Sequence, residues 1–419
     1  MSLILVVADS VRHDVIGCAR LGGSVQPHRI EPAETPTIDA LAAQGVRFER
    51  VITAAPWTVP SVAAMMTGVF GHRLGLAKWE QPFPAEFATL FYQARQRDLK
   101  VASFVFDPTH LFRRVPEAGV RGSSQDVPSV VQWVREHRDE EYLLFVHYWW
   151  THIPYTAAPM DIDAWRMVSN QVLGALRKSP AARDGVVRLY RHAVTQFSED
   201  FLPRLLDAAN LDTTWIAVTS DHGESWGGRE QSAQLRDVFD LHGTHLHDEV
   251  LRIPLVIRPP GGGAGRRIPQ LIRSVDFAPT FAMLLGAPFA AADDIDGVDL
   301  SACILREAPV PSLEAVSVAS YDFVDAPELP EDPRSLYQAF SLTTEDFKLI
   351  HELTPERRLA FDLDRDPAEQ HDLGSEPDER FRAGWKRLER EIGRARIGDW
   401  LPQDAQAVRQ RLRELGYLE

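Results

Sequence analysis

Short apolar runs recur along the first two thirds of the chain, and each is bounded by residues typical of turns. Runs that are apolar at successive positions suit strands that are covered on both faces. These runs lie at Leu3–Ala8, Val101–Phe106, Tyr142–Tyr148, Trp215–Thr219 and Pro254–Ile257. Helix-like stretches lie between several of them, at Thr37–Gln44, Pro84–Gln96, Pro128–His137, Gly185–Asn210 and Phe277–Leu285. The alternation predicts an α/β fold around a mostly parallel sheet.

The pattern changes near residue 286, first to turns rich in Ala, Pro and Asp and then to short strand-like pieces. We expect strands at Ala315–Ser320, Tyr337–Thr343 and Phe347–His351, and helices near 376–397 and 403–416. The glycine-rich stretch 260–267 is typical of a surface loop. The expected organisation is a large α/β domain over 1–285 and a small antiparallel-sheet subdomain over 286–419.

The amino-acid composition limits which binding partners and which cellular compartment we expect for this protein. The formal net charge of −15 argues against nucleic acid or an anionic membrane as the main partner. Only two cysteines, Cys18 and Cys303, are present, so we expect no disulfide framework and a cytoplasmic location. The apolar run at the N-terminus has no basic segment before it and stops at Asp9, which favours a buried strand over a signal peptide. No run of 18 apolar residues occurs, so we expect no membrane span.

Several polar residues with metal-binding or nucleophilic chemistry follow directly after apolar runs. Asp9 ends the first run, Thr58 follows an apolar stretch, and Asp221-His222 comes just after Trp215–Thr219. In a mostly parallel sheet, ligands collect at the ends of the strands. Asp9 could instead cap a helix, and an Asp-His pair alone is common in loops. Together these residues predict one metal site with mixed Asp and His ligands, suited to Mn, Zn, Mg or Ca.

The segment 56–68 carries a family resemblance. It reads Pro-Trp-Thr-Val-Pro-Ser-Val-Ala-Ala-Met-Met-Thr-Gly and resembles the sulfatase signature, Cys-x-Pro-x-Arg followed by a short apolar run and Thr-Gly. Further segments resemble motifs of the same family in the same order, at 8–14, 35–48, 145–155, 219–224, 241–255, 274–280, 296–300 and 361–373. The resemblance covers about residues 3 to 375. It implies the sulfatase-like branch of the alkaline phosphatase superfamily and an alkaline-phosphatase-like fold.

Two departures from the sulfatase signature change the expected chemistry. Thr58 stands where a sulfatase has the Cys or Ser that matures to formylglycine, and threonine cannot form that aldehyde. Val62 replaces the arginine that orients formylglycine. The resemblance therefore implies that the Thr58 hydroxyl itself attacks, as in the phosphodiesterase-like branches. Phosphorus chemistry is favoured over sulfate chemistry.

The resemblance also implies roles for individual residues. Asp9, Thr58, Asp221 and His222 are expected to bind one divalent cation. His152 is expected to protonate the leaving group, and His242 to stabilise the non-bridging oxygens. Further candidates for substrate contacts are Arg12, His72 and His245. His147, within an apolar run, is interpreted as a core histidine.

A second metal is the less favoured alternative. Related dinuclear enzymes have an aspartate shortly before the histidine that corresponds to His152, whereas this chain has Trp149, Trp150 and Thr151. A zinc site formed by His242, His245 or His247 stays a minority alternative.

The expected function is metal-dependent hydrolysis of phosphate diesters or phosphonate monoesters, with phosphate monoesters also open, through a covalent phospho-Thr58. The expected partner is a small anionic ester, and homo-oligomerisation is left open. A sulfatase-like hydrolase or a phosphoryl or sulfuryl transferase without formylglycine is the first alternative. A non-catalytic relative that binds an anion is the second.

Overall fold

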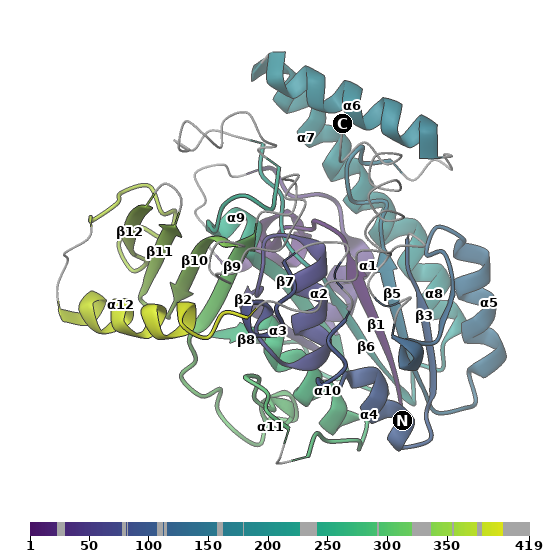
Figure 1. The fold of residues 1–419 in the computed structure, drawn as a ribbon. Coiled ribbons are helices and arrows are strands. Elements are labelled where there is room, and N and C mark those ends of the chain that lie inside the picture. Colours follow the sequence, from purple (N-terminus) through teal and green to yellow (C-terminus); the bar gives the residue numbers. More distant parts are fainter. Residues whose placement is uncertain are drawn as a thin grey trace.

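The computed structural model describes most of the chain. The described residues are 1–22, 30–77, 81, 83–106, 112, 115–156, 162–178, 180–226, 241–290, 293–320, 337–353, 356–374 and 379–396. They form a large sheet and a small sheet, which lie beside one another (Figure 1).

The large sheet has eight strands in the order β4-β3-β5-β1-β6-β7-β2-β8. Their bounds are β1 Ser2–Ala8, β2 Val46–Ile52, β3 Lys100–Phe104, β4 Val120–Gly122, β5 Tyr142–Tyr148, β6 Thr214–Thr219, β7 Arg252–Arg258 and β8 Arg266–Arg273. Only β7 runs antiparallel to its neighbours, β6 and β2, and every other pairing is parallel. The predicted fold class is confirmed.

The central strand β1 shows why the sheet is covered on both faces. Leu3, Leu5 and Val7 belong to one hydrophobic cluster, whereas Ile4 and Val6 belong to another. Successive side chains of a strand point to opposite faces, so an unbroken apolar run supplies both clusters. This arrangement leaves only the ends of the strand for polar chemistry.

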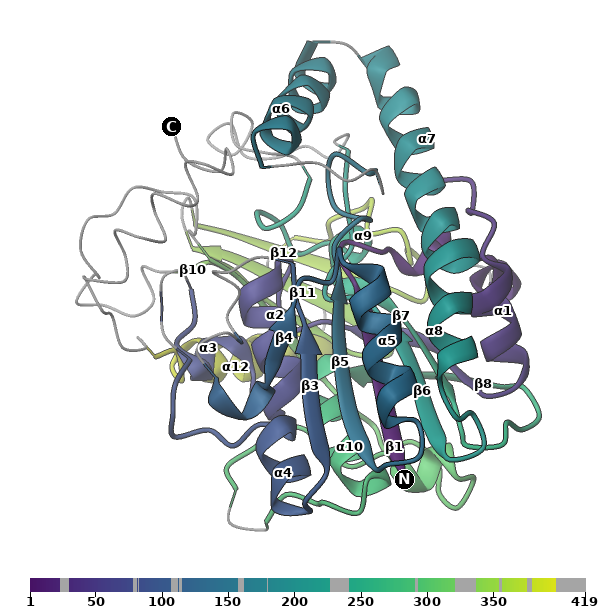
Figure 2. The same ribbon diagram turned by 90° about the vertical axis from the view of Figure 1, so that its right-hand side faces the viewer.

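Helices form the outer layers of this sandwich (Figures 1 and 2). Residues of α2 Thr58–Thr67, α4 Leu90–Gln96, α10 Phe277–Leu284 and α11 Ser301–Ile304 pack into the first cluster. Residues of α1 Pro36–Ala43, α5 Val127–His137, α7 Pro180–Gln196 and α8 Leu202–Ala208 pack into the second. A π-helical turn, Phe197–Phe201, joins α7 to α8. The remaining helices of the large part are α3 Gly71–Leu74, α6 Ile162–Lys178 and α9 Asp248–Leu251. The helix α6 and the start of α7 project beyond the sheet (Figure 2).

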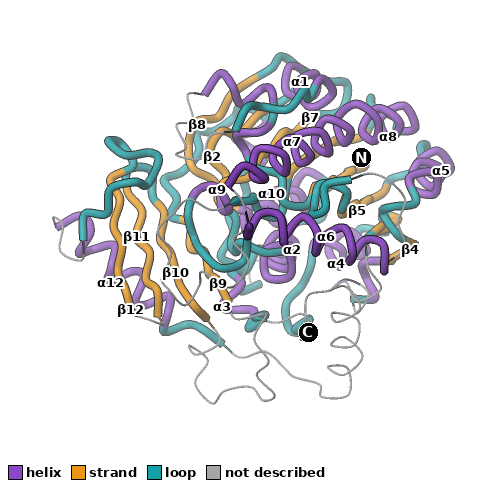
Figure 3. The backbone as a smooth tube through the Cα atoms, turned by 90° about the horizontal axis from the view of Figure 1, so that it is seen from above, coloured by secondary structure: helices purple, strands orange, loops and turns teal. Residues whose placement is uncertain are grey.

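The small sheet is antiparallel and has the order β12-β11-β10-β9 (Figure 3). Its strands are β9 Ala315–Ser320, β10 Tyr337–Thr343, β11 Phe347–Leu353 and β12 Glu356–Asp362. The helix α12, Glu379–Ile392, packs on β10 and β11. Gly384 permits this approach, because a Cβ at that position would lie 2.8 Å from side-chain atoms of Leu349 and Phe347.

The sequence expectations match the structure closely in the central strands and less well elsewhere. The strands Tyr142–Tyr148, Ala315–Ser320 and Tyr337–Thr343 have the predicted bounds. The strands β2, β4, β8 and β12 were not predicted, and β8 begins inside the expected loop 260–267. The expected helix at 403–416 lies outside the described residues, and the domain boundary at 285 stays a prediction. Among the described residues, no helix is long and apolar enough to cross a membrane.

Candidate metal and nucleophile site

Asp9 and Asp221 follow neighbouring strands of the large sheet. Because β1 and β6 pair in parallel with Val7 opposite Thr219, the two carboxylates emerge side by side. The Ser10 backbone N–H donates to Asp221 Oδ1 at 3.2 Å, and the Ser10 hydroxyl donates to Asp9 Oδ1 at 2.7 Å. Ser10 has a positive φ of 59°, which turns the chain sharply after Asp9. The turn therefore fixes one oxygen of each carboxylate.

The other carboxylate oxygens and the imidazole of His222 converge on one point. Asp9 Oδ2 and Asp221 Oδ2 are buried, and both lie within 3.6 Å of His147 Nε2. His222 donates from Nδ1 to the Gly223 carbonyl at 2.8 Å, which leaves the lone pair on Nε2. Ligand atoms of these three residues lie within 4.8 Å of one another. Two carboxylates and one imidazole form a donor set that fits a divalent cation.

Thr58 lies at the first position of α2, beside this cluster. Its Oγ1 lies 3.5 Å from His222 Nε2, and the side chain is 5% exposed. The N-terminus of a helix favours negative charge, so its position suits an attacking alkoxide or a bound anion. Ser61, one turn further on, donates to the Asp221 carbonyl at 2.6 Å. That bond holds the start of α2 against the metal-binding turn.

The imidazole of His147 contacts the carboxylates of Asp9 and Asp221. The Nε2 atom is 3.1 Å from Asp9 Oδ2 and 3.6 Å from Asp221 Oδ2. Burial by itself would lower the pKa of His147, but the contacts with Asp221 and Asp9 outweigh it and raise the pKa to about 9. The sequence interpretation as a core histidine is therefore incomplete: the ring is buried, yet its polar edge belongs to the site.

The surroundings of His152 disfavour the protonated form that the predicted role of general acid requires. Burial lowers its pKa to about 4, so the ring is neutral at neutral pH. Its Nδ1 lies 2.9 Å from the Ile153 carbonyl, which can only accept, so Nδ1 carries the proton and Nε2 the lone pair. Trp149 stacks on the ring at 4.1 Å. The neutral ring can accept a proton only at Nε2, and its low pKa makes it a weak base.

The surroundings of His242 raise its pKa, whereas those of His152 lower it. Its Nδ1 lies 2.9 Å from Glu224 Oε1, and the ring centroid is 4.4 Å from that of His222. Burial would lower the pKa of His242, but Glu224 raises it. The Tyr155 hydroxyl donates to the second oxygen of Glu224 at 2.8 Å. Glu224 therefore favours the protonated form of His242, in which the ring can serve as a proton donor.

Arg12 is committed to other groups and does not fit the predicted role of substrate ligand. The side chain is 1% exposed, and its Nε and Nη2 donate to both oxygens of Asp14 at 2.8 and 2.7 Å. Its Nη1 donates to the Glu224 carbonyl at 3.0 Å. Arg12 thus stabilises the backbone at Glu224.

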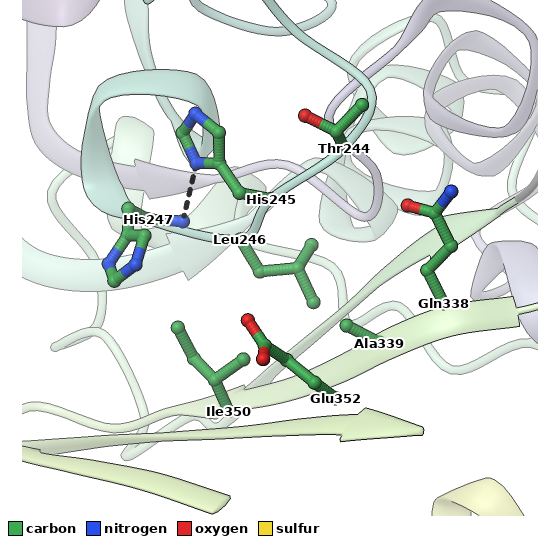
Figure 4. A pocket seen from close by; sticks show the side chains of 8 residues that line it. All are labelled: Thr244, His245, Leu246, His247, Gln338, Ala339, Ile350 and Glu352. Atoms are coloured by element: carbon green, nitrogen blue, oxygen red, sulfur yellow. Dashed lines mark hydrogen bonds between the residues drawn. The ribbon is translucent and has the colours of Figure 1, made fainter. Parts of the chain in front are cut away.

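His72 does not fit that role either, and His245 lines a different pocket. The buried ring of His72 packs against Phe70 and Phe340, with Nε2 3.2 Å from Glu391 on α12. The prediction fails because His72 packs at the contact with the small sheet. His245 lines a pocket beside that sheet (Figure 4).

The three histidines of the 241–247 loop do not converge on a zinc ion. His242 pairs with Glu224, and His247 pairs through Nδ1 with Glu369 at 2.8 Å. In the described part of the chain, Asp9, Asp221 and His222 are the one group of three whose geometry suits a metal.

The comparison with protein families decides the class. The model "Sulfatase" matches residues 2–114 and 124–287, and the model "N-sulphoglucosamine sulphohydrolase, C-terminal" matches residues 238–396. The chain belongs to the sulfatase family. Within the alkaline phosphatase-like superfamily, it is a hydrolase of ester bonds from a family whose members generally bind a divalent metal. The resemblance stated from the sequence is confirmed, whereas the role of Thr58 stays a prediction.

Individual members of the sulfatase family are only distantly similar. The uncharacterized sulfatase YidJ of Escherichia coli (strain K12) is 22% identical over 89% of this chain and 82% of its own length. The phosphonate monoester hydrolase of Agrobacterium radiobacter aligns with a TM-score of 0.69 and 18% identity over 93% and 95% of the two chains. A putative sulfatase of Bacteroides fragilis aligns with a TM-score of 0.71 and 16% identity over 94% and 95%. At these identities the structures show a shared fold.

Proposed function

We propose that this sulfatase-family chain is a metal-dependent hydrolase of phosphate diesters or phosphonate monoesters, with Thr58 as the nucleophile. The observation that carries the proposal is the hydroxyl of Thr58, which faces His222 Nε2 at 3.5 Å from the N-terminus of α2. A hydroxyl in that place can attack directly. It offers no route to the aldehyde hydrate on which sulfatases with formylglycine rely.

Asp9, Asp221, His222 and Thr58 would hold one divalent cation. When bound, such an ion lowers the pKa of a nearby hydroxyl and polarises the ester oxygen. Manganese, zinc, magnesium and calcium all accept this mixture of oxygen and nitrogen ligands. The count of one rests on the single convergent group among the described residues.

The protein's own residues divide the proton transfers between two histidines. His152 Nε2 takes the proton of Thr58 as the new oxygen–phosphorus bond forms. His242 Nε2 donates a proton to the leaving oxygen as the old bond breaks. Water then attacks the phosphothreonine, with the proton going to the now neutral His242, and Thr58 recovers its proton from His152. The cycle returns both histidines to their starting states.

Sulfate ester hydrolysis is the second candidate, and the family itself favours it. The model matches and the relative from E. coli carry the name sulfatase. Against it stand the threonine at position 58 and the valine at position 62. Transfer of the phosphoryl or sulfuryl group to an acceptor alcohol would use the same kind of intermediate on Thr58, with the alcohol attacking it in place of water. A small anionic ester as the substrate and a cytoplasmic location remain part of the proposal.

Initial rates on four 4-nitrophenyl esters test the proposal: phosphate monoester, methyl phosphate diester, phenylphosphonate and sulfate. We expect the diester or phosphonate to dominate in metal-loaded protein and to require the Thr58 hydroxyl, with Thr58→Val as the control that keeps the side-chain shape. Preference for sulfate would move the chain to the second candidate. Absence of turnover together with absence of metal binding would identify a non-catalytic anion-binding relative.

A further inference from the structure

The helix α7 brings a tyrosine to the turn that follows β1. The inner face of α7 carries Val186, Tyr190, Ala193 and Val194, whose spacing of three or four residues is that of one helix face. Tyr190 is the polar member of this face, and it is fully buried. A buried tyrosine normally finds a partner for its hydroxyl. The partners of Tyr190 lie in the turn at residues 9–12.

The Tyr190 hydroxyl bonds two backbone groups of this turn at once. It accepts from the Arg12 N–H at 2.9 Å and donates to the Ser10 carbonyl at 2.9 Å. The two groups flank Val11, and all three residues of the turn are buried. Buried backbone groups need hydrogen-bond partners. One side-chain oxygen thus satisfies a donor and an acceptor of the segment that carries Asp9.

The other bonds of the turn come from the second metal-binding segment. The Ser10 N–H donates to Asp221 Oδ1 at 3.2 Å, and the Val11 N–H donates to Ser220 Oγ at 2.8 Å. Both acceptors follow β6. These bonds tie the two metal-binding turns to each other. Tyr190 ties them in addition to α7, in the layer that covers the sheet.

The turn needs such support because Ser10 has a left-handed backbone. Its φ of 59° is disfavoured for residues with a Cβ and persists where the surroundings fix it. The Ser10 side chain also donates to Asp9 Oδ1 at 2.7 Å. Relaxation of Ser10 would therefore move its contacts with Asp9 and with Asp221 together.

The ring of Tyr190 is itself held by two aromatic neighbours. It packs edge-on against Tyr155, with centroids 5.4 Å apart, and against Trp226, with centroids 4.8 Å apart. Phenylalanine at position 190 would keep these ring contacts. The variant Tyr190→Phe thus removes one oxygen atom and leaves the packing of α7 in place.

We propose that Tyr190 is a positioning residue for the metal site, whose hydroxyl holds the turn at 9–12 in the shape that lets Asp9 and Asp221 bind one cation together. The proposal rests on the proposed function for the presence of the ion. It adds a residue that lies outside every segment that resembles a family motif. Tyr190 acts through Ser10 and Arg12.

Calorimetric titration with Mn²⁺ at one fixed pH tests this role. We expect Tyr190→Phe to weaken Mn²⁺ binding by about ten- to a hundredfold, because outer partners of metal ligands have effects of that size. Tyr142→Phe is the matched control. Tyr142 is also fully buried and belongs to the same hydrophobic cluster, but it begins β5, at the opposite end of the strand from the site. This control should bind Mn²⁺ like the wild type.

Thermal unfolding of the metal-free variants separates positioning from a merely structural role. A lower Tm in Tyr190→Phe with wild-type affinity for Mn²⁺ would overturn the proposal. Hydrogen exchange of the metal-free wild type gives a second test that needs no variant. The amides of residues 10–12 should exchange as slowly as those of β1. Rapid exchange there would show that Tyr190 does not hold the turn, and would also overturn the proposal.

The outcomes also separate this inference from the proposed function. Mn²⁺ binding that depends on Tyr190, without turnover of any nitrophenyl ester, would reject the function and keep the inference. Turnover of the diester or phosphonate with wild-type Mn²⁺ affinity in Tyr190→Phe would do the reverse. A wild-type protein that binds no Mn²⁺ would overturn the metal site and this inference with it.

Discussion

His147 Nε2 lies 3.1 Å from Asp9 Oδ2, at the point where a metal ion would meet that carboxylate. A proton on His147 and a cation on Asp9 therefore compete for the same negative charge. In the metal-free protein, with its pKa at about 9, His147 holds that proton throughout the neutral range. Metal binding must displace it or bind against its charge.

This competition predicts that metal affinity increases with pH. Below the His147 pKa, each rise of one pH unit should strengthen binding by up to about tenfold, and the dependence should flatten above about pH 9. Calorimetric titration with Mn²⁺ in two buffers of different ionisation enthalpy measures the released proton directly. His147→Gln removes the titrating group and should flatten the dependence. A slope that is unchanged in this variant would contradict the competition.

Loss of the Thr58 hydroxyl should stop the proposed reaction without unfolding the protein. We expect Thr58→Val to lower kcat by about a thousandfold or more, because the attacking atom is gone, and Thr58→Ser to retain part of the activity. Rapid acid quenching of wild-type protein during turnover, followed by peptide mass analysis, should detect phosphorylation on the peptide that contains Thr58. Wild-type rates in Thr58→Val would remove Thr58 from the mechanism.

Glu224 should control the protonation of His242. Because Glu224 raises the pKa of His242, the active protonated form persists to higher pH and is lost as pH rises through that value. Glu224→Gln should move the basic limb of the kcat profile to lower pH and reduce kcat by about ten- to a hundredfold. Tyr155→Phe leaves the carboxylate in place and should have a smaller effect. Identical profiles for wild type and Glu224→Gln would show that His242 does not donate the proton.

The buried pair Lys348 and Glu369 should contribute strongly to stability. Both side chains are fully buried with Nζ and Oε1 2.8 Å apart, and the other Glu369 oxygen lies 2.8 Å from His247 Nδ1. Glu369→Leu leaves the lysine without its counter-charge and should lower the free energy of unfolding by about 3–5 kcal/mol in urea denaturation. Glu140→Gln breaks the exposed pair with Lys100 and should cost less than about 1 kcal/mol. A similar loss of unfolding free energy in Glu369→Leu and Glu140→Gln would show that the buried pair contributes no more to stability than the exposed pair.

The parts of the site carried by local motifs could be predicted, and the parts made by distant contacts could not. Asp221 and His222 are adjacent in sequence and follow an apolar strand, so one short segment reveals both. His147 lies in a strand that is otherwise apolar, and its partner Asp9 follows a different strand. A single histidine in such a run is indistinguishable from a packed core residue until strand pairing is known.

The same distinction explains the errors in the fold. The central strand β5 is apolar at every position except His147 and was recognised with its bounds. The strands β2 and β8 carry several arginines because part of each strand meets solvent, which breaks the apolar run. The surroundings of His152 and His242, which include Ile153 and Glu224, are set by the fold, so motif spacing alone could not indicate which ring is more easily protonated.

The turn after β1 has a consequence for the order in which the protein is made. Ser10 contacts Asp221 across 211 positions of sequence, so the ribosome completes Asp9 and Thr58 long before the second carboxylate exists. Until β6 docks beside β1, the nascent chain has no cluster to bind a cation, and metal cannot assist the early stages of folding. A product terminated before residue 221 would retain the proposed nucleophile yet remain unable to bind the ion. Metal uptake by a growing chain would therefore report that the centre of the sheet has closed.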